Sequence, residues 1–111
     1  MSNGVNRKAG IIHCQFRLGC SDLKAHLFNL HVVDDPYCIC SDLVEDCNHF
    51  FFHCRLYEDQ RVILFANLAE LCPDRIFSID MLLHGCDNFS DEQNLELANL
   101  VEIYISDSSR F

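Results

Sequence analysis

The sequence predicts a mainly α fold: a small helical domain interrupted by one irregular, cysteine-rich loop. A chain of 111 residues, half of them hydrophobic, suits a single small domain. Apolar residues recur at helical spacing in several segments. Between these segments, residues 38–54 hold four cysteines and two histidines with little regular pattern. We therefore predict a single α-rich domain at 7–106, a zinc-binding segment at 37–56, and disordered ends at 1–6 and 107–111.

The first two predicted helices precede the cysteine-rich loop. One covers residues 7–18 and ends at Gly19, a residue type common just past helix ends. The other begins at Ser21 and Asp22, which resemble an N-cap. It ends before Pro36, because proline moves the preceding residue out of the α region. The apolar positions are Ile11, Ile12, Phe16 and Leu18 in one helix, and Leu23, Leu27 and Leu30 in the other.

Three further helices are predicted after the loop. A strong helix covers residues 57–71, and a short helical turn at 79–84 is closed by Gly85. The last helix has the clearest start, because Ser90 and Gln93 have the spacing of a capping box. The apolar positions of the two long helices are Tyr57, Leu64, Leu68 and Leu71, and Leu97, Leu100, Val101, Tyr104 and Ile105.

The charge balance argues against independent nucleic-acid binding. Eight Lys and Arg oppose 17 Asp and Glu, which gives a net charge of −9. A surface this acidic repels phosphate backbones over most of its area. The one candidate basic cluster is formed by Arg7, Lys8 and Arg17. We expect weak or no binding of nucleic acid by this chain alone.

The sequence shows neither the apolar stretch of a signal peptide nor a run long enough to span a membrane. We therefore expect an intracellular chain, cytoplasmic or nuclear, that is neither secreted nor bound to a membrane. In a reducing compartment the eight cysteines would be metal ligands or buried thiols, because disulfides persist mainly in oxidising compartments.

The segment CICSDLVEDCNHFFFHC offers six potential zinc ligands in 17 residues. Cys38-x-Cys40 forms one chelating pair and His49-x4-Cys54 a second, joined by a linker that can fold back over one ion. Three thiolates and one imidazole make a closed tetrahedral set, which is typical of structural zinc, whereas catalytic zinc keeps an open position. We therefore predict one structural Zn²⁺ held by Cys38, Cys40, His49 and Cys54, and no catalysis.

Two other residues of the segment, Cys47 and His53, are left outside this set. Each lies close to a chosen ligand in the chain, so one ion cannot easily use both neighbours. Cys47 suits a buried thiol, and His53 suits a surface position or a hydrogen bond to a carbonyl. The alternative to a zinc site is a metal-free helical domain with buried thiols, which would serve protein interaction.

Aromatic and basic residues near the second ligand pair allow two interpretations. The run Phe50-Phe51-Phe52 could stack on bases, but it lacks interleaved basic residues, so burial against the helices is favoured. Arg55 and Arg61 could contact phosphate, although pairing with the nearby acidic residues Glu58 and Asp59 is the simpler expectation.

Three stretches occur in a distinctive order: RLGCSDLKAHLF, then PYCIC, then VEDCNHFFFHCRLY. Together they resemble the zinc-binding region that follows the reverse transcriptase domain of non-LTR retrotransposons. The resemblance covers roughly residues 7–70. The matching positions are Arg17-Leu18-Gly19, the pair Cys38 and Cys40, the acidic Glu45, the pair His49 and Cys54, and the tail residues Tyr57 and Arg61.

This resemblance implies the same four zinc ligands as the spacing. It also implies a detached C-terminal module without catalysis, because the polymerase palm of that family is missing from this chain. The partners that it implies are the rest of a retroelement polyprotein or its RNA. A non-functional fragment of such an element is the other interpretation.

Overall fold

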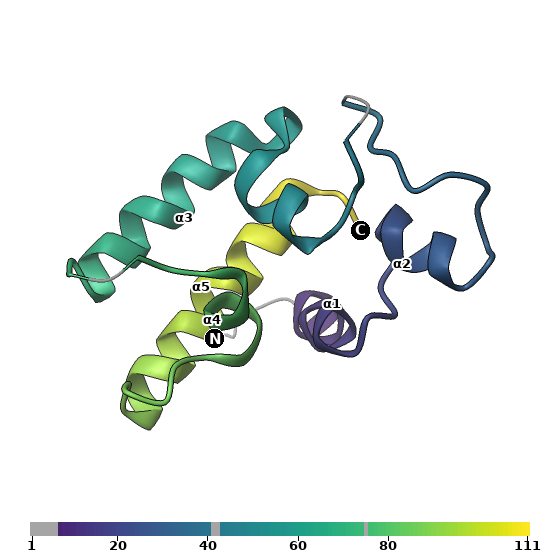
Figure 1. Cartoon of the computed structure of the whole chain (residues 1–111). Coiled ribbons are helices and arrows are strands. Elements are labelled where there is room, and N and C mark those ends of the chain that lie inside the picture. The colour runs from purple at the N-terminus through teal and green to yellow at the C-terminus, as the bar shows by residue number, and fades with distance from the viewer. Residues whose placement is uncertain (1–6, 41–42, 75) are drawn as a thin grey trace.

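The computed structural model describes residues 7–40, 43–74 and 76–111, and in these ranges the chain is mainly helical and has no strand (Figure 1). Its α-helices are α1 (Arg7–Leu18), α2 (Lys24–Asn29), α3 (Glu58–Leu71), α4 (Ile79–His84) and α5 (Asp91–Ser108). A π-helix (His49–His53) and a 3-10 helix (Arg55–Tyr57) lie between α2 and α3. The mainly α fold is thus confirmed, while the expected disorder at 1–6 falls outside the described residues.

Helix α5 is the centre of the fold. It packs against α3 on one side and α1 on another, and α4 contacts both α1 and α5 (Figure 1). Its inner face buries Leu97, Val101, Tyr104 and Ile105. The predicted capping box is present: the Ser90 hydroxyl accepts from the Gln93 N–H at 3.2 Å, and the Gln93 side chain accepts from the Ser90 N–H at 2.9 Å. No described helix is long and apolar enough to cross a bilayer.

The predicted stops of α1 and α4 also hold. Gly19 and Gly85 follow these helices with φ of 71° and 84°, a left-handed conformation that favours glycine. Helix α2, in contrast, is shorter than predicted at both ends. It does not begin at Ser21, because the carboxylate of Glu45 caps it by accepting the Lys24 N–H at 2.9 Å. It ends at Asn29, several residues before the end expected at Pro36, because the chain turns at His31, whose φ is 61°.

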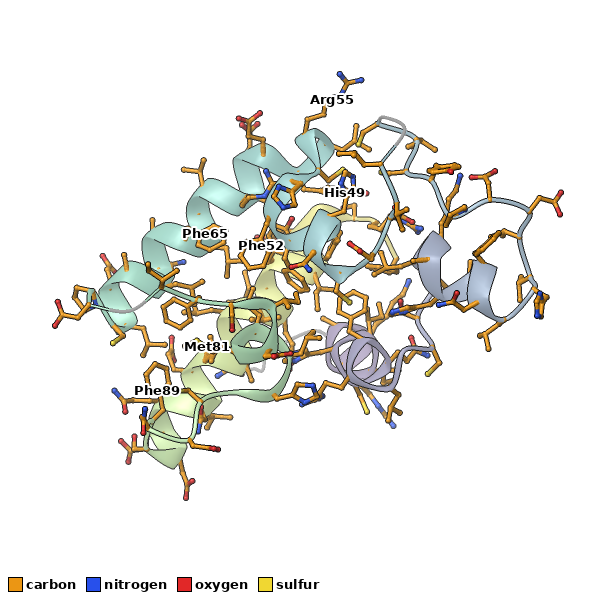
Figure 2. The ribbon with its side chains drawn as sticks, viewed as in Figure 1. His49, Phe52, Arg55, Phe65, Met81 and Phe89 are labelled. Carbon is orange, nitrogen blue, oxygen red and sulfur yellow. The ribbon has the colours of Figure 1, made fainter. Side chains whose placement is uncertain are left out.

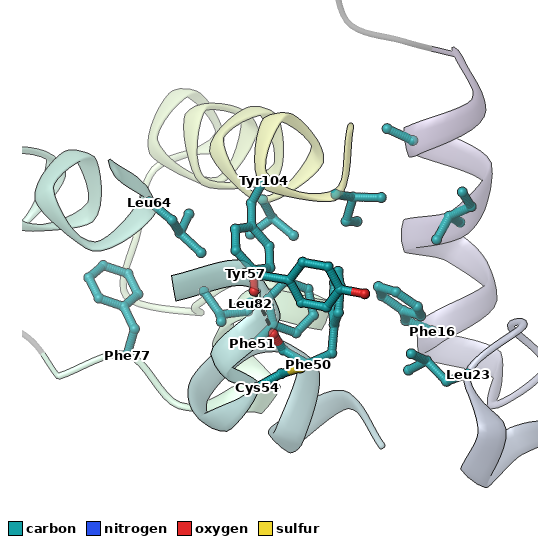
Figure 3. Close-up of a cluster of buried hydrophobic side chains, with 14 of the residues drawn as sticks. Phe16, Leu23, Phe50, Phe51, Cys54, Tyr57, Leu64, Phe77, Leu82 and Tyr104 are labelled. Atoms are coloured by element: carbon teal, nitrogen blue, oxygen red, sulfur yellow. Dashed lines mark hydrogen bonds between the residues drawn. The ribbon is translucent and has the colours of Figure 1, made fainter. Parts of the chain in front are cut away.

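The core is an aromatic cluster centred on the π-helix (Figure 3). The π-helix inserts Phe50 and Phe51, both fully buried, between α1 and α5. The Tyr104 hydroxyl donates to the carbonyl oxygen of Phe50 at 2.5 Å, which fixes the π-helix to α5. The predicted burial is therefore confirmed for these two phenylalanines, and Phe52 is half-buried against Phe65. The rings in edge or tilted contact with Phe50 are Phe16, Phe51, Tyr57, Tyr104 and Phe111.

The structure differs from the disordered tail expected at 107–111. Helix α5 continues to Ser108, and the left-handed Ser109 then turns the chain back onto the core. The Phe111 ring lies 5.5 Å from that of Phe16. The polar stretch SDSSRF shows no helical periodicity, and its stabilising contacts come from residues far away in the sequence, which is why local pattern missed it.

Candidate metal centre

Two short structures present the predicted ligand pairs. The first pair lies in a turn held together by two backbone hydrogen bonds, from Cys38 N–H to Leu43 O and from Glu45 N–H to Pro36 O, both 2.8 Å. The second pair brackets the π-helix: His49 is its first residue, and the Cys54 N–H donates to the His49 carbonyl at 2.7 Å. A π-helix turn thus brings an x4-spaced pair close together.

The four predicted ligands converge. All are buried, and their ligand atoms lie within 4.8 Å of one another. The sulfurs of Cys38 and Cys54 are 3.7 Å apart, and the sulfur of Cys40 is 3.2 Å from Nε2 of His49. Tetrahedral zinc, with Zn–S of about 2.3 Å and Zn–N of about 2.0 Å, would separate two sulfurs by about 3.8 Å and a sulfur from a nitrogen by about 3.5 Å. The arrangement therefore fits a tetrahedral ion with only small adjustments.

His49 is buried with one ring nitrogen facing the cluster. The residue is 4% exposed, and its Nε2 lies 3.2 Å from the sulfur of Cys40. Nε2 is therefore the nitrogen that an ion shared with the three sulfurs would use. The other nitrogen, Nδ1, has no hydrogen-bond partner among the described residues.

Burial controls the protonation of the thiols. It raises the pKa of Cys38 to about 12 and also raises the pKa of Cys54, so both are neutral thiols when no cation is near. A coordinated metal reverses this, because thiolates and not thiols are the ligands. Metal binding at this centre would therefore release protons and weaken as the pH falls.

The two remaining residues of the segment lie outside the cluster of four. Cys47 is half-buried against the core, and burial raises the pKa of its thiol to about 12. His53 is exposed at the end of the π-helix. His53 thus lies at the surface, one of the two positions expected of it, whereas Cys47 is only half-buried and not the fully buried thiol that was expected.

Glu45 is a buried carboxylate next to the centre. Its Oε2 lies 3.8 Å from the sulfur of Cys38, and its two oxygens accept hydrogen bonds from the guanidinium of Arg110. Burial alone would raise its pKa, but hydrogen bonds from Arg110 and the Lys24 N–H outweigh it and lower the pKa below the ordinary value. Glu45 therefore stays ionised. Arg110, 65 residues away, carried no sequence signal of this role.

Neither arginine after the second pair forms the expected ion pair with Glu58 or Asp59 in the part of the chain that the structure describes. Arg61 does not pair with Glu58 or Asp59: its Nε donates to the Phe51 carbonyl at 3.2 Å, and its Nη2 donates to the Cys54 carbonyl. A helix end leaves carbonyl groups without helical partners, and a guanidinium can satisfy several of them. Arg55 is exposed and points away from the body of the domain (Figure 2).

A buried histidine in α1 was missed by sequence reasoning. Nδ1 of His13 lies 3.0 Å from a carboxylate oxygen of Glu102, and Nε2 lies 2.8 Å from the carbonyl oxygen of Leu82. The ring therefore lies between an acceptor on α4 and an acceptor on α5. His13 thus ties α1 to α4 and α5 and is not part of the metal centre.

Searches with this chain against protein-family models, curated proteins and solved structures found no match. The chain is a small helical domain with a buried Cys3His cluster that could hold one metal ion.

Proposed function

We propose that this chain is a structural zinc module. The observation that carries the proposal is the convergence of four buried ligand atoms, from Cys38, Cys40, His49 and Cys54, within 4.8 Å. Three thiolates and an imidazole fill a tetrahedral ion completely, so no position is left for a substrate or an activated water. The ion supplies a cross-link between the segment that carries Cys38 and Cys40 and the π-helix, whose residues Phe50 and Phe51 lie in the core.

We further propose that the module is of the type that follows the reverse transcriptase domain of non-LTR retrotransposons. The order of the motifs from Arg17 to Arg61 supports this. On this proposal the module has no catalysis of its own, and its partners are the rest of a retroelement polyprotein or its RNA. The net charge of −9 supports weak or no independent binding to nucleic acid.

Metal content tests the first part of the proposal. Protein purified under reducing conditions should carry one zinc per chain by elemental analysis. Cys38→Ser and Cys54→Ser should lose stoichiometric zinc, whereas the matched control Cys47→Ser, at a half-buried thiol outside the cluster, should keep it. A folded wild-type chain without zinc, even after zinc is supplied, would favour the metal-free interaction domain instead.

Nucleic-acid binding tests the second part. Fluorescence anisotropy at physiological salt should give affinities for duplex DNA weaker than the roughly 10⁻⁴ to 10⁻⁶ M of non-specific binders. Structured RNA should be bound no better by the isolated chain. Tight, salt-sensitive binding to either would contradict the expectation of weak or no independent nucleic-acid binding.

A further inference from the structure

The last two residues of the sequence fold back onto the metal centre. Nε of Arg110 donates to Oε2 of Glu45 at 3.0 Å, and its Nη2 donates to Oε1 at 2.7 Å. The same Nη2 donates to the carbonyl oxygen of Asp22 at 3.0 Å. The Glu45 carboxylate is 5% exposed and the Arg110 side chain 24% exposed. This is a forked, largely buried ion pair, the strong kind of charge-assisted contact.

Phe111 anchors this contact. Its ring packs on those of Phe16 and Phe50, at 5.5 and 5.6 Å between centroids. The guanidinium carbon of Arg110 lies 5.0 Å from the centroid of the same ring. The orientation of Arg110 is therefore set on one side by Glu45 and on the other by the aromatic core.

Glu45, in turn, connects the ion pair to the proposed ligand turn. Its carboxylate caps α2 through the Lys24 N–H, and its backbone carbonyl accepts the Ala25 N–H at 3.0 Å. Its own N–H holds the turn that carries Cys38, whose sulfur lies 3.8 Å from the carboxylate. A displacement of Glu45 would thus disturb both α2 and the first ligand pair.

Charge gives Arg110 a second role. Three thiolates and one Zn²⁺ sum to a charge of −1, and the buried carboxylate of Glu45 lies directly beside them. Like charges at such short range repel strongly when they are shielded from water. The guanidinium of Arg110 neutralises the carboxylate at this position.

We propose that Arg110 and Phe111 form a clasp that regulates how firmly the centre holds its metal, with Arg110 as a positioning residue that acts through Glu45. When the clasp is closed, Glu45 caps α2 and keeps the Cys38 turn in place. When it opens, the turn loosens and the ion escapes faster. This inference rests on the proposed function, since it concerns the retention of the same ion.

The test is the rate of zinc release from loaded protein into an excess of a colorimetric chelator. Loss of a partner that orients metal ligands typically costs 10–100-fold in metal affinity. For Arg110→Ala we expect release about tenfold faster than in the wild type, with one zinc per chain still bound at the start. Arg110→Lys keeps the charge but loses the fork, and should fall between the two. The control Arg55→Ala removes the same charge from an exposed side chain beside Cys54, and should release zinc at the wild-type rate.

A double-mutant cycle shows whether the effect passes through Glu45. Glu45→Gln keeps an acceptor for Lys24 but loses the charge. If Arg110 acts through Glu45, the double variant Glu45→Gln/Arg110→Ala should release zinc no faster than the faster single variant, because the coupled effects do not add. Simple addition of the two effects would overturn that role, even if the fold is intact.

The outcomes separate this inference from the proposed function. Zinc-free wild-type protein would overturn the structural zinc module. A stoichiometric wild-type site whose release rate is unchanged by Arg110→Ala would overturn the clasp alone. Hydrogen exchange at the Lys24 and Ala25 amides reads the clasp without reference to the metal: faster exchange in Arg110→Ala is expected, and unchanged exchange would contradict the link from Arg110 through Glu45 to α2.

Discussion

Removal of the metal should unfold the cysteine-rich segment in part, with a boundary near His49. Residues 37–48 contain little besides Cys38, Cys40 and Glu45 that is buried among the described positions. The π-helix, in contrast, is held by Phe50 and Phe51 in the core. A strong chelator under reducing conditions is the perturbation, because it takes away the ion and leaves every side chain in place.

The free energy that keeps the chain ordered without metal differs on the two sides of this boundary. Ordering the backbone costs about 1 kcal/mol or more per residue, so residues 37–48 need on the order of 10 kcal/mol to stay fixed. A structural zinc site supplies about 10 kcal/mol or more, whereas each hydrogen bond that the Glu45 carboxylate accepts there is worth only about 1–3 kcal/mol. Full burial of each phenylalanine is worth about 1.5–3 kcal/mol, and the hydrogen bond from Tyr104 adds about 1 kcal/mol. The π-helix should therefore survive in part without metal.

Hydrogen exchange with and without chelator measures this directly. The amides of Cys38 and Glu45, hydrogen-bonded within the ligand turn, should lose their protection. The Cys54 amide should lose only part of its protection, and amides near Leu97 and Val101 should keep nearly all of theirs. Unchanged protection at Cys38 and Glu45 would refute the reasoning, since the turn would then fold by packing alone. An equal loss of protection at the Leu97 amide would show that unfolding extends into α5 and would refute a boundary near His49.

Three further predictions concern the fold around the centre. Tyr104→Phe, which removes a buried hydroxyl but little volume, should lower the free energy of unfolding in urea by about 1–2 kcal/mol; the control Tyr37→Phe, at a half-exposed ring, should change it by less than about 0.5 kcal/mol. His13→Ala should cost about 3 kcal/mol in the same assay, because two hydrogen bonds are lost and a carboxylate loses its partner; the exposed His84→Ala should be nearly neutral. Burial lowers the pKa of His26 in the folded protein below its ordinary 6.5. The neutral ring therefore contributes fully to the free energy of unfolding above about pH 6.5, and this contribution is lost as the pH falls toward the pKa of the folded state. His26→Gln should accordingly flatten the fall of urea midpoints between about pH 7 and 5, and a slope equal to that of the wild type would contradict it.

Features that depend on neighbours in the chain could be predicted from the sequence. Gly19 and Gly85 end helices because glycine adopts a left-handed conformation at little cost, whatever surrounds it. The capping box at Ser90 joins residues three positions apart. The four candidate ligands also lie close together in the sequence, so their spacing alone brought them into one prediction, and the structure brings their atoms together.

Features that depend on distant residues were decided by the tertiary structure. Glu45 and Arg110 are 65 positions apart, and His13 and Glu102 are 89 apart, so no local pattern could pair them. The early start expected for α2 was wrong because a carboxylate from the ligand turn, and not Ser21, caps it. The tail at 107–111 is ordered because Phe111 finds an aromatic cluster that exists only once α1, α5 and the π-helix have packed. Local hydrogen bonds and chelation act within a few residues, whereas burial and ion pairing depend on which segments the folded core brings into contact.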